Sequence, residues 1–477
     1  MRKVTTIKSV IFQTGAFLWL VALSICAAQA QPLADVNRKF TPEQLIEDVD
    51  FYVKALEEAH VNPYANVTAE KFRVRAETIK SKIRRRGAMT QNEFWRLFTP
   101  LVGMIGDSHS IVVEPRFFIK AESDPVKYLP IFTDYIDGEI VITQSLTDEK
   151  IEKGAVITAV NGVASKELIR KLGGYRLGTS REKAHSAAGW LWVGAAELFG
   201  RPDKFTLSLK SGKKVTVQGM KLPEVMKRRQ AANADRLATT FSPIELKFLD
   251  GETAYLNSNT FTYDLEKYKA LIGDAFTRIK SAGVRNLIID VRNNDGGNSA
   301  LGEALIDMFN AKPYRSWASK WKRSVFYAED LKRGNIPLPA SVIEKYLAAR
   351  PGETLSSGFE TITPGANPLR FGGRVFILSA KETFSSGTMF LGTIKDNRLA
   401  KIIGEETNEP ACMFGEMSLF WLPNTRLRVS LSVKSWIPPA GCKGMRGVVP
   451  DVVVNRRVAD YVTGRDGILE TALNLIK

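Results

Sequence analysis

In the second half of the chain, short apolar runs that are typical of strands alternate with segments of helical apolar spacing. The runs cover residues 253–256, 286–291 and 374–378, and a helical pattern follows each of them. Strands that alternate with helices predict an α/β core with a largely buried sheet, which we place at residues 236–477. Residues 312–372, rich in Pro, Gly and charge, interrupt this pattern and are interpreted as an inserted lid over a cleft.

Two further regions precede this core, so the expected fold class is α/β in three parts. Residues 31–122 have apolar residues at helical spacing, which predicts a helical N-terminal domain. Residues 123–235 combine strand-like runs with a helical stretch and predict a small mixed α/β module. Within this module, Lys153–Gly162 resembles the central strand and turn of a PDZ domain, which binds peptide ends at a sheet edge.

Residues 1–30 have the organisation of a secretory signal peptide. Arg2, Lys3 and Lys8 precede an apolar run and a small-residue cleavage site that ends at Ala30. The alternative is that the run remains as a membrane anchor. We therefore expect an exported protein, in the bacterial periplasm or outside the cell. Cleavage lowers the formal net charge from +16 to +13, which favours weak association with anionic membrane or cell-wall surfaces and not with nucleic acid.

Cys412 and Cys442 are the only cysteines left after removal of the signal segment, and an oxidising compartment would let them pair. The predicted disulfide closes a loop of about 30 residues and contributes about 3–4 kcal/mol of stability. The alternative is two buried free cysteines. Three cysteines and three isolated histidines in the whole chain do not indicate a metal site, and no organic cofactor is implied.

Three polar segments are candidates for chemistry. Ser385 and Ser386 fall between a strand and a helix, where N–H groups and the helix dipole would stabilise an oxyanion. The alternative is that one of them is an ordinary helix N-cap. Gly296 and Gly297 follow a strand, where they either let the backbone approach a ligand or form a plain turn. The third segment holds His109, and an isolated histidine is more often structural than catalytic.

Taken together, these segments resemble the tail-specific (C-terminal processing) serine peptidase family, in particular its tricorn-like, histidine-using branch. The resemblance covers most of the mature chain and includes, in order, the runs at residues 290–297, 383–386, 404–407 and 447–451. It implies a PDZ-like module followed by a crotonase-like α/β catalytic core.

Carried over position by position, the resemblance implies that Ser385 is the nucleophile, His109 the general base and Ser108 the residue that orients the imidazole. It places the oxyanion-hole amides on Ser386 and on either Gly296 or Gly297. In the family's other branch the base is a lysine downstream of the nucleophile. The matching position here is Pro410, which favours the serine–histidine arrangement.

One position departs from the family pattern. The glutamate that precedes the late Gly-Val-x-Pro-Asp run in the tricorn-like branch is replaced here by Gly444. The candidate substitutes for this acid are Glu405, Glu406, Glu409 and Asp107, and the sequence does not choose among them.

The predicted function is an exported serine peptidase that cleaves peptide or protein substrates by acyl transfer. The alternative is a non-catalytic ligand- or peptide-binding protein on the same scaffold. The missing glutamate favours this alternative, and the presence of both Ser385 and His109 favours the enzyme. An esterase that uses the same residues is a third option.

Overall fold

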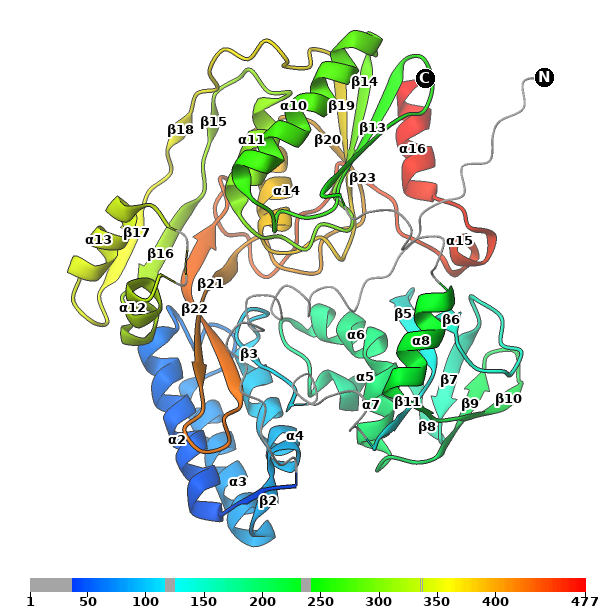
Figure 1. Cartoon of the computed structure of the whole chain (residues 1–477), viewed down its shortest axis with the longest axis vertical. Helices are drawn as coiled ribbons and strands as arrows, with labels where there is room; N and C mark the ends of the chain where they lie inside the picture. Colours follow the sequence, from blue (N-terminus) through cyan, green and yellow to red (C-terminus); the bar gives the residue numbers. More distant parts are fainter. Residues whose placement is uncertain (1–36, 116–124, 233–241, 335, 337) are drawn as a thin grey trace.

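The computed structural model describes residues 37–115, 125–232, 242–334, 336 and 338–477, arranged as in Figure 1. The predicted signal segment, residues 1–30, lies outside the described residues. Within the described ranges, we find no helix with the length and hydropathy needed to cross a membrane.

The N-terminal region is mainly helical. Its elements are β1 (Lys39–Phe40), α2 (Pro42–Ala59), α3 (Ala69–Arg86), β2 (Met89–Thr90), α4 (Gln91–Val102) and the short 3-10 helix η1 (Gly103–Ile105). Helices α2, α3 and α4 each begin at a threonine whose hydroxyl accepts a backbone N–H, which satisfies a donor that has no partner inside the helix. Their apolar faces share one hydrophobic core with the following module.

The second region is a mixed α/β module. Its elements are β4 (Lys127–Tyr128), β5 (Ile131–Ile136), β6 (Glu139–Ser145), β7 (Val156–Val160), β8 (Val163–Ala164), α5 (Ser165–Gly173), α6 (Ser180–Gly189), α7 (Leu191–Leu198), β9 (Lys204–Leu209), β10 (Lys214–Gln218), β11 (Met220–Lys221) and α8 (Leu222–Ala232). The main sheet is antiparallel in the order β10-β9-β7-β6-β5. Helix α6 packs along β5 and faces the C-terminal core.

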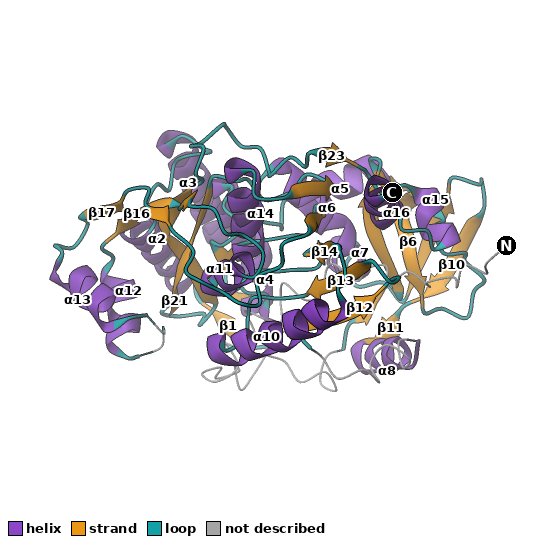
Figure 2. Ribbon diagram, turned by 90° about the horizontal axis from the view of Figure 1, so that it is seen from above, coloured by secondary structure: helices purple, strands orange, loops and turns teal. Residues whose placement is uncertain are grey.

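The C-terminal core is a six-stranded sheet between two helical layers (Figures 1 and 2). Its elements are β12 (Ile244–Phe248), β13 (Thr253–Ser258), α10 (Leu265–Ala282), β14 (Asn286–Asp290), α11 (Ser299–Asp307), β19 (Arg374–Ser379), α14 (Ser386–Asn397), β20 (Lys401–Gly404), β23 (Val452–Val453), α15 (Val458–Thr463) and α16 (Gly467–Ile476). The strand order is β12-β13-β14-β19-β20-β23, and all pairs except β12–β13 are parallel.

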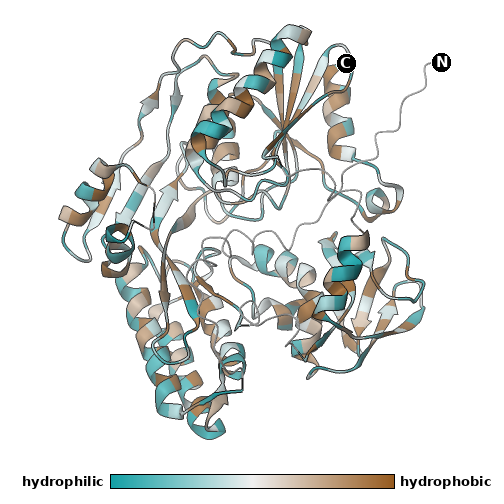
Figure 3. Cartoon of the chain, in the orientation of Figure 1, coloured by the Kyte–Doolittle hydropathy of each residue, from teal (hydrophilic) through white to brown (hydrophobic). Residues whose placement is uncertain are grey.

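The parallel strands of this sheet are apolar on both faces, as Figure 3 shows for its central strands. Ile289 and Ile377 pack against α10, α11 and α14 on one side. Ile288 and Phe376 pack against α16 on the other side. A parallel sheet covered by helices on both faces requires such continuously apolar strands, and this confirms the predicted α/β character of the core.

Residues 312–372, which the sequence predicts to be an inserted lid, contribute strands to a second sheet. Their elements, together with two long strands, are β15 (Tyr314–Arg315), β16 (Ala318–Lys322), α12 (Val325–Lys332), α13 (Ala340–Ala348), β17 (Thr354–Ser357), β18 (Thr361–Ile362), β21 (Met413–Trp421) and β22 (Arg428–Ile437). Although the segment is polar in composition, it contains three buried aromatic residues whose rings contact one another, Trp321, Tyr327 and Tyr346. Because it has this core, the segment joins a second sheet, ordered β17-β16-β22-β21.

The second sheet connects the N-terminal region to the C-terminal half of the chain. The short strand β3 (Ile111–Val112), which follows the N-terminal helices, pairs antiparallel with β22, so that Ile111 lies opposite Ser430 and Val112 opposite Val429. This pairing brings the residues just before β3 to the carboxyl ends of the parallel strands of the core.

Candidate active site

Ser385 lies in a strained turn between β19 and α14. Its φ of 53° and ψ of −124° fall in a region that L-amino acids other than glycine rarely occupy, and such strain is concentrated at functional sites. Ser385 is the residue that precedes the helix, but its hydroxyl does not cap the helix N-terminus. The N-cap alternative is therefore wrong for Ser385, and the strained backbone directs its side chain elsewhere.

The Ser385 hydroxyl lies against His109, which is 276 positions upstream in the chain. The distance from His109 Nε2 to Ser385 Oγ is 3.1 Å, within hydrogen-bonding range. The Phe384 ring stacks on the imidazole, with centroids 4.8 Å apart and an interplanar angle of 18°. The Ser430 hydroxyl donates to the His109 carbonyl oxygen at 2.8 Å, so β22 fixes the backbone beneath the imidazole.

Glu409 occupies the other side of the imidazole. Its Oε1 is 3.6 Å from His109 Nδ1, and its Oε2 accepts the Ser385 backbone N–H at 2.5 Å. The Glu409 side chain is 1% exposed. Gly444, the position of the missing family acid, is instead an exposed residue with a φ of 78°. Of the candidate substitutes, Glu409 is the acid that contacts both Ser385 and His109.

The other candidate acids have different contacts. Glu405 binds Arg456, and the partly exposed Glu406 pairs with Arg181 and Arg446. Asp107 accepts the His109 backbone N–H at 2.9 Å and does not hydrogen-bond to its ring.

Asp107 instead supports the segment that carries His109. Its carboxylate also accepts the hydroxyls of Ser110 and Ser432, at 2.5 and 2.6 Å. His60 Nε2 lies 3.2 Å from Asp107, and His60 Nδ1 accepts a backbone N–H, so the neutral imidazole carries its proton on Nε2 and donates it to Asp107. This buried support from His60 was not predicted, because only the fold brings residues 47 positions apart together.

Ser108, which the resemblance implies would orient the imidazole, contacts an acid of the module. The Ser108 side chain hydrogen-bonds to Glu182 on α6, and Glu409 lies beside the imidazole Nδ1. Glu182 also accepts the Thr179 N–H in a capping box. Burial raises the pKa of Glu182 to about 7.

Burial also sets the ionisation of the central pair. It lowers the pKa of the His109 imidazolium below its usual value, and the nearby Asp107 charge opposes this shift. Burial, followed by repulsion from Glu182, raises the pKa of Glu409 well above its usual value. Each shift disfavours the charged form of its group. Both shifts therefore favour the state in which His109 and Glu409 are uncharged.

Gly296 lies beside Ser385, and Gly297 lies beside Ser386. A Cβ on Gly296 would approach the Ser385 Cβ to 2.6 Å, and a Cβ on Gly297 would approach the Phe261 carbonyl oxygen to 2.3 Å, so neither position has room for a side chain. The Gly296 N–H donates to Asn294 Oδ1 at 3.0 Å. The Ser386 hydroxyl donates to the Gly297 carbonyl oxygen at 2.6 Å and connects the glycine turn to the start of α14.

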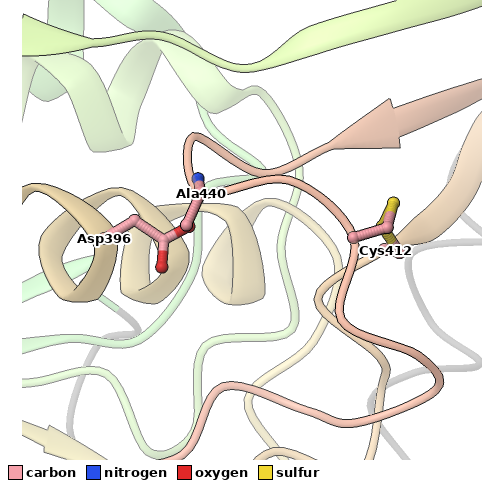
Figure 4. Close-up of a disulfide and its surroundings, with 4 residues drawn as sticks. Asp396, Cys412 and Ala440 are labelled. Carbon is pink, nitrogen blue, oxygen red and sulfur yellow. Dashed lines mark hydrogen bonds between the residues drawn. A yellow bond between two sulfur atoms is a disulfide. The ribbon is translucent and has the colours of Figure 1, made fainter.

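Cys412 and Cys442 form a disulfide close to the Glu409 segment (Figure 4). Cys412 follows Glu409 by three residues, and Cys442 is exposed at the surface. The Ala440 N–H donates to Asp396 at the end of α14 at 2.9 Å, and the Ala411 N–H donates to the Arg446 carbonyl oxygen at 2.8 Å. The disulfide thus joins two loops, one of which carries Glu409.

The double variant Cys412→Ser/Cys442→Ser should lose about 3–4 kcal/mol of unfolding free energy, because the unfolded chain regains the entropy of an open loop. The sequence separation of the two cysteines is 30. Equilibrium denaturation of the oxidised protein and of the double variant measures the difference. Unchanged denaturation midpoints would contradict a stabilising role for this bond.

A nucleophilic hydroxyl, an imidazole and a buried carboxylate in this contact order are typical of serine hydrolases. Consistent with that class, the profile of peptidase family S41 matches residues 252–454. The C-terminal core is therefore a peptidase domain of the S41 type, and the chain is a serine-type peptidase, a hydrolase. A search of curated proteins gave no match.

Among solved structures, mature CPAF has the same fold as this chain. Mature CPAF superposes with a TM-score of 0.63 at 17% identity, over 91% of this chain and 97% of the other. The photosystem II D1 C-terminal processing protease has a TM-score of 0.44 at 16% identity, over 87% and 93% of the two chains. The tricorn protease has a TM-score of 0.32 at 16% identity, and the match covers 91% of this chain and 36% of that one.

Proposed function

We propose that this peptidase hydrolyses peptide bonds by acyl transfer through Ser385 and His109, with Glu409 replacing the family's missing acid. The observation that carries the proposal is the 3.1 Å contact between Ser385 Oγ and His109 Nε2, made by a serine that does not cap its helix. The substrate class that the family implies is a peptide or protein.

In this mechanism His109 Nε2 takes the Ser385 hydroxyl proton as Oγ attacks the peptide carbonyl carbon. The tetrahedral oxyanion accepts hydrogen bonds from the backbone N–H of Ser386, at the start of α14, and from that of Gly297. We assign the second donor to Gly297 because the Gly296 N–H is engaged by Asn294. His109 then protonates the leaving amine, and water releases the acyl group by the reverse sequence of steps.

Glu409 stabilises the charge that develops on His109. With His109 neutral and its proton on Nδ1, Nε2 has a lone pair for the serine proton, and ionised Glu409 favours this tautomer. In the active form His109 is neutral and Glu409 is ionised. This form therefore has one proton fewer than the two inactive forms, in which either His109 is cationic or Glu409 is neutral. We expect activity to rise with pH as the pair loses that proton, and to be low at acidic pH.

A fluorophosphonate probe tests the proposal and discriminates it from the binding-protein alternative. We expect covalent labelling at Ser385, identified by mass spectrometry of the modified peptide, and labelling slower by about 10²–10⁴-fold in His109→Ala, which lacks the base. Peptide hydrolysis by the same preparation separates a peptidase from an esterase. Absence of labelling in the folded wild-type protein would favour the non-catalytic binding protein.

We also infer that residues 123–235 are a PDZ-like module that receives the substrate and that the C-terminal core is crotonase-like. In support, the segment predicted as strand and turn forms β7 followed by a hairpin to β8. We further propose that the protein is exported to the periplasm or the cell exterior. The disulfide supports export, because such bonds persist mainly in oxidising compartments.

A further inference from the structure

A buried polar network lies behind the backbone of His109. Its members are the Asp107 carboxylate, the His60 imidazole and the hydroxyls of Ser110 and Ser432. They come from three separate parts of the chain, because His60 follows α2, Asp107 and Ser110 flank His109, and Ser432 lies on β22. All four side chains belong to buried residues. The loop that carries the proposed general base is therefore attached to an N-terminal helix and to the second sheet.

Asp107 is the common acceptor of this network. Its Oδ1 accepts the His109 N–H, and its Oδ2 accepts the hydroxyls of Ser110 and Ser432 and the His60 Nε2–H. Four donors match the roughly four lone-pair sites of an ionised carboxylate. Burial opposes the charged form, but the hydrogen bonds from His60 and Ser110 hold the pKa of Asp107 below its usual value. Asp107 is therefore a buried anion that donors from three parts of the chain keep in place.

Strand β22 holds His109 through two of its serines. The Ser432 hydroxyl donates to Asp107 at 2.6 Å, and Asp107 accepts the His109 N–H at 2.9 Å. Two residues earlier on the same strand, the Ser430 hydroxyl donates to the His109 carbonyl oxygen at 2.8 Å. Because both the N–H and the carbonyl group of His109 are held, its imidazole has a fixed starting point for the contact with Ser385.

His60 closes the far side of the network. Its Nδ1 accepts the Asn62 N–H at 3.0 Å, so Nε2 carries the ring proton and donates it to Asp107 at 3.2 Å. The imidazole also packs against the Phe414 ring on β21, with centroids 4.8 Å apart. In this arrangement His60 acts as a neutral donor, and the network needs no change in its protonation.

The charge of Asp107 also acts on the proposed catalytic pair. Burial lowers the pKa of His109, and the Asp107 charge raises it. Burial and repulsion from Glu182 raise the pKa of Glu409, and the Asp107 charge adds to that increase. A nearby anion favours the imidazolium that forms when His109 takes the Ser385 proton. The Asp107 charge is therefore suited to a site at which a positive charge develops during the reaction.

We propose that Asp107 is a positioning residue for the proposed hydrolysis and that His60 acts through it: the network fixes the backbone of His109 and thereby holds its imidazole in register with Ser385. If Asp107 loses an acceptor atom, or one of the donors that fix it, the His109 segment shifts and transfer of the Ser385 proton slows. The inference rests on the proposed function, because its readout is reaction at Ser385.

The test is the rate of fluorophosphonate labelling of the full chain as a function of pH. Asp107→Asn keeps the shape of the side chain, but it replaces one acceptor oxygen by an amide NH₂ group and removes the charge. We expect labelling on the plateau to be slower by about 10²-fold, the cost of misplacing a reacting group by about 1 Å. We also expect the acid limb at a lower pH than in the wild type, because the Asp107 charge raises the pKa of both His109 and Glu409.

Loss of stability alone would not move the acid limb of the folded protein. A wild-type rate in folded Asp107→Asn, or an acid limb that stays in place, would overturn the inference. A wild-type protein that is not labelled at all would instead overturn the proposed function.

Two serines of the second sheet form a matched pair, which decides the question even if Asp107→Asn does not fold. Ser432 and Ser418 are both fully buried, and each hydroxyl donates to an aspartate, Asp107 in the first case and Asp330 in the second. We expect Ser432→Ala to be labelled about 10-fold more slowly than the wild type and Ser418→Ala to be labelled at the wild-type rate. Equal rates in the two variants would contradict the proposal.

The contribution of His60 is tested by rescue with a conservative variant. His60→Leu keeps a buried side chain but removes the donor to Asp107, and we expect labelling slower by about 10-fold. His60→Gln keeps an N–H donor and an acceptor, so we expect it to recover most of the wild-type rate. If folded His60→Leu is labelled like the wild type, or His60→Gln is labelled no faster than His60→Leu, the inference is wrong for His60.

Discussion

Replacement of Ser385 by alanine should lower peptide hydrolysis by about 10⁴–10⁶-fold, as removal of the nucleophile does in other serine peptidases. The expected loss is nearly complete because Ser385 Oγ is the atom that faces His109 Nε2 at 3.1 Å. Stability should change little, since this hydroxyl does not cap α14. Turnover of a peptide substrate and the thermal unfolding midpoint are the two measurements.

The neighbouring serine is a matched control. Ser386 has the same side chain, one position along, but its hydroxyl donates to the Gly297 carbonyl oxygen and not to His109. The Ser386→Ala variant retains the backbone N–H proposed for the oxyanion hole, so we expect a far smaller loss than in Ser385→Ala. Equal losses in the two variants, or full activity in Ser385→Ala, would refute the assignment of the nucleophile.

Glu409→Gln should lower turnover by about 10⁴-fold, the loss seen when the orienting acid of another serine peptidase family becomes an amide. The substitution keeps the shape of the side chain and an oxygen for the Ser385 N–H, but it removes the negative charge that favours the productive His109 tautomer. Steady-state kinetics of the purified variant on a peptide substrate measures the loss, which we expect mainly in kcat.

The pH profile provides a second, independent readout of Glu409. In the wild type the acid limb belongs to the His109–Glu409 pair, whereas in Glu409→Gln it belongs to His109 alone, whose pKa is lowered by burial. We therefore expect the residual activity of the variant to rise at a pH below the usual histidine value of about 6.5. Glu406→Gln, which removes a partly exposed carboxylate from the same loop, is the control. Wild-type turnover in Glu409→Gln would exclude Glu409 from the mechanism.

The local parts of this structure could be predicted from the sequence. The strand, turn and helix around Ser385 follow from a buried apolar run, a polar interruption and a helical pattern, all within residues 374–397. The family resemblance placed His109 opposite Ser385. The residue pattern alone does not place these two residues together, because their contact depends on the pairing of β3 with β22, which are far apart in the chain.

The choice of acid could not be predicted for a related reason. Glu405, Glu406 and Glu409 are all acidic residues of one short segment, and only the folded loop shows which of them turns inward beside His109. Similarly, the role expected for Ser108 did not anticipate Glu182, which reaches it from the module. The polar composition of residues 312–372 likewise gave no indication that their aromatic side chains pack together. Whether a side chain is buried, and in which direction it points, depends on the tertiary structure and cannot be read from residue type and spacing.

The pairing of β3 with β22 has a consequence for the order in which a working enzyme is made. A ribosome synthesises His109 early and Ser385 late, and the strand that supports His109 is completed only at Ile437. A nascent chain interrupted before β22 lacks this support. The contact between His109 and Ser385 therefore acquires its full backing only after Ser430, 321 positions downstream of His109, has been synthesised.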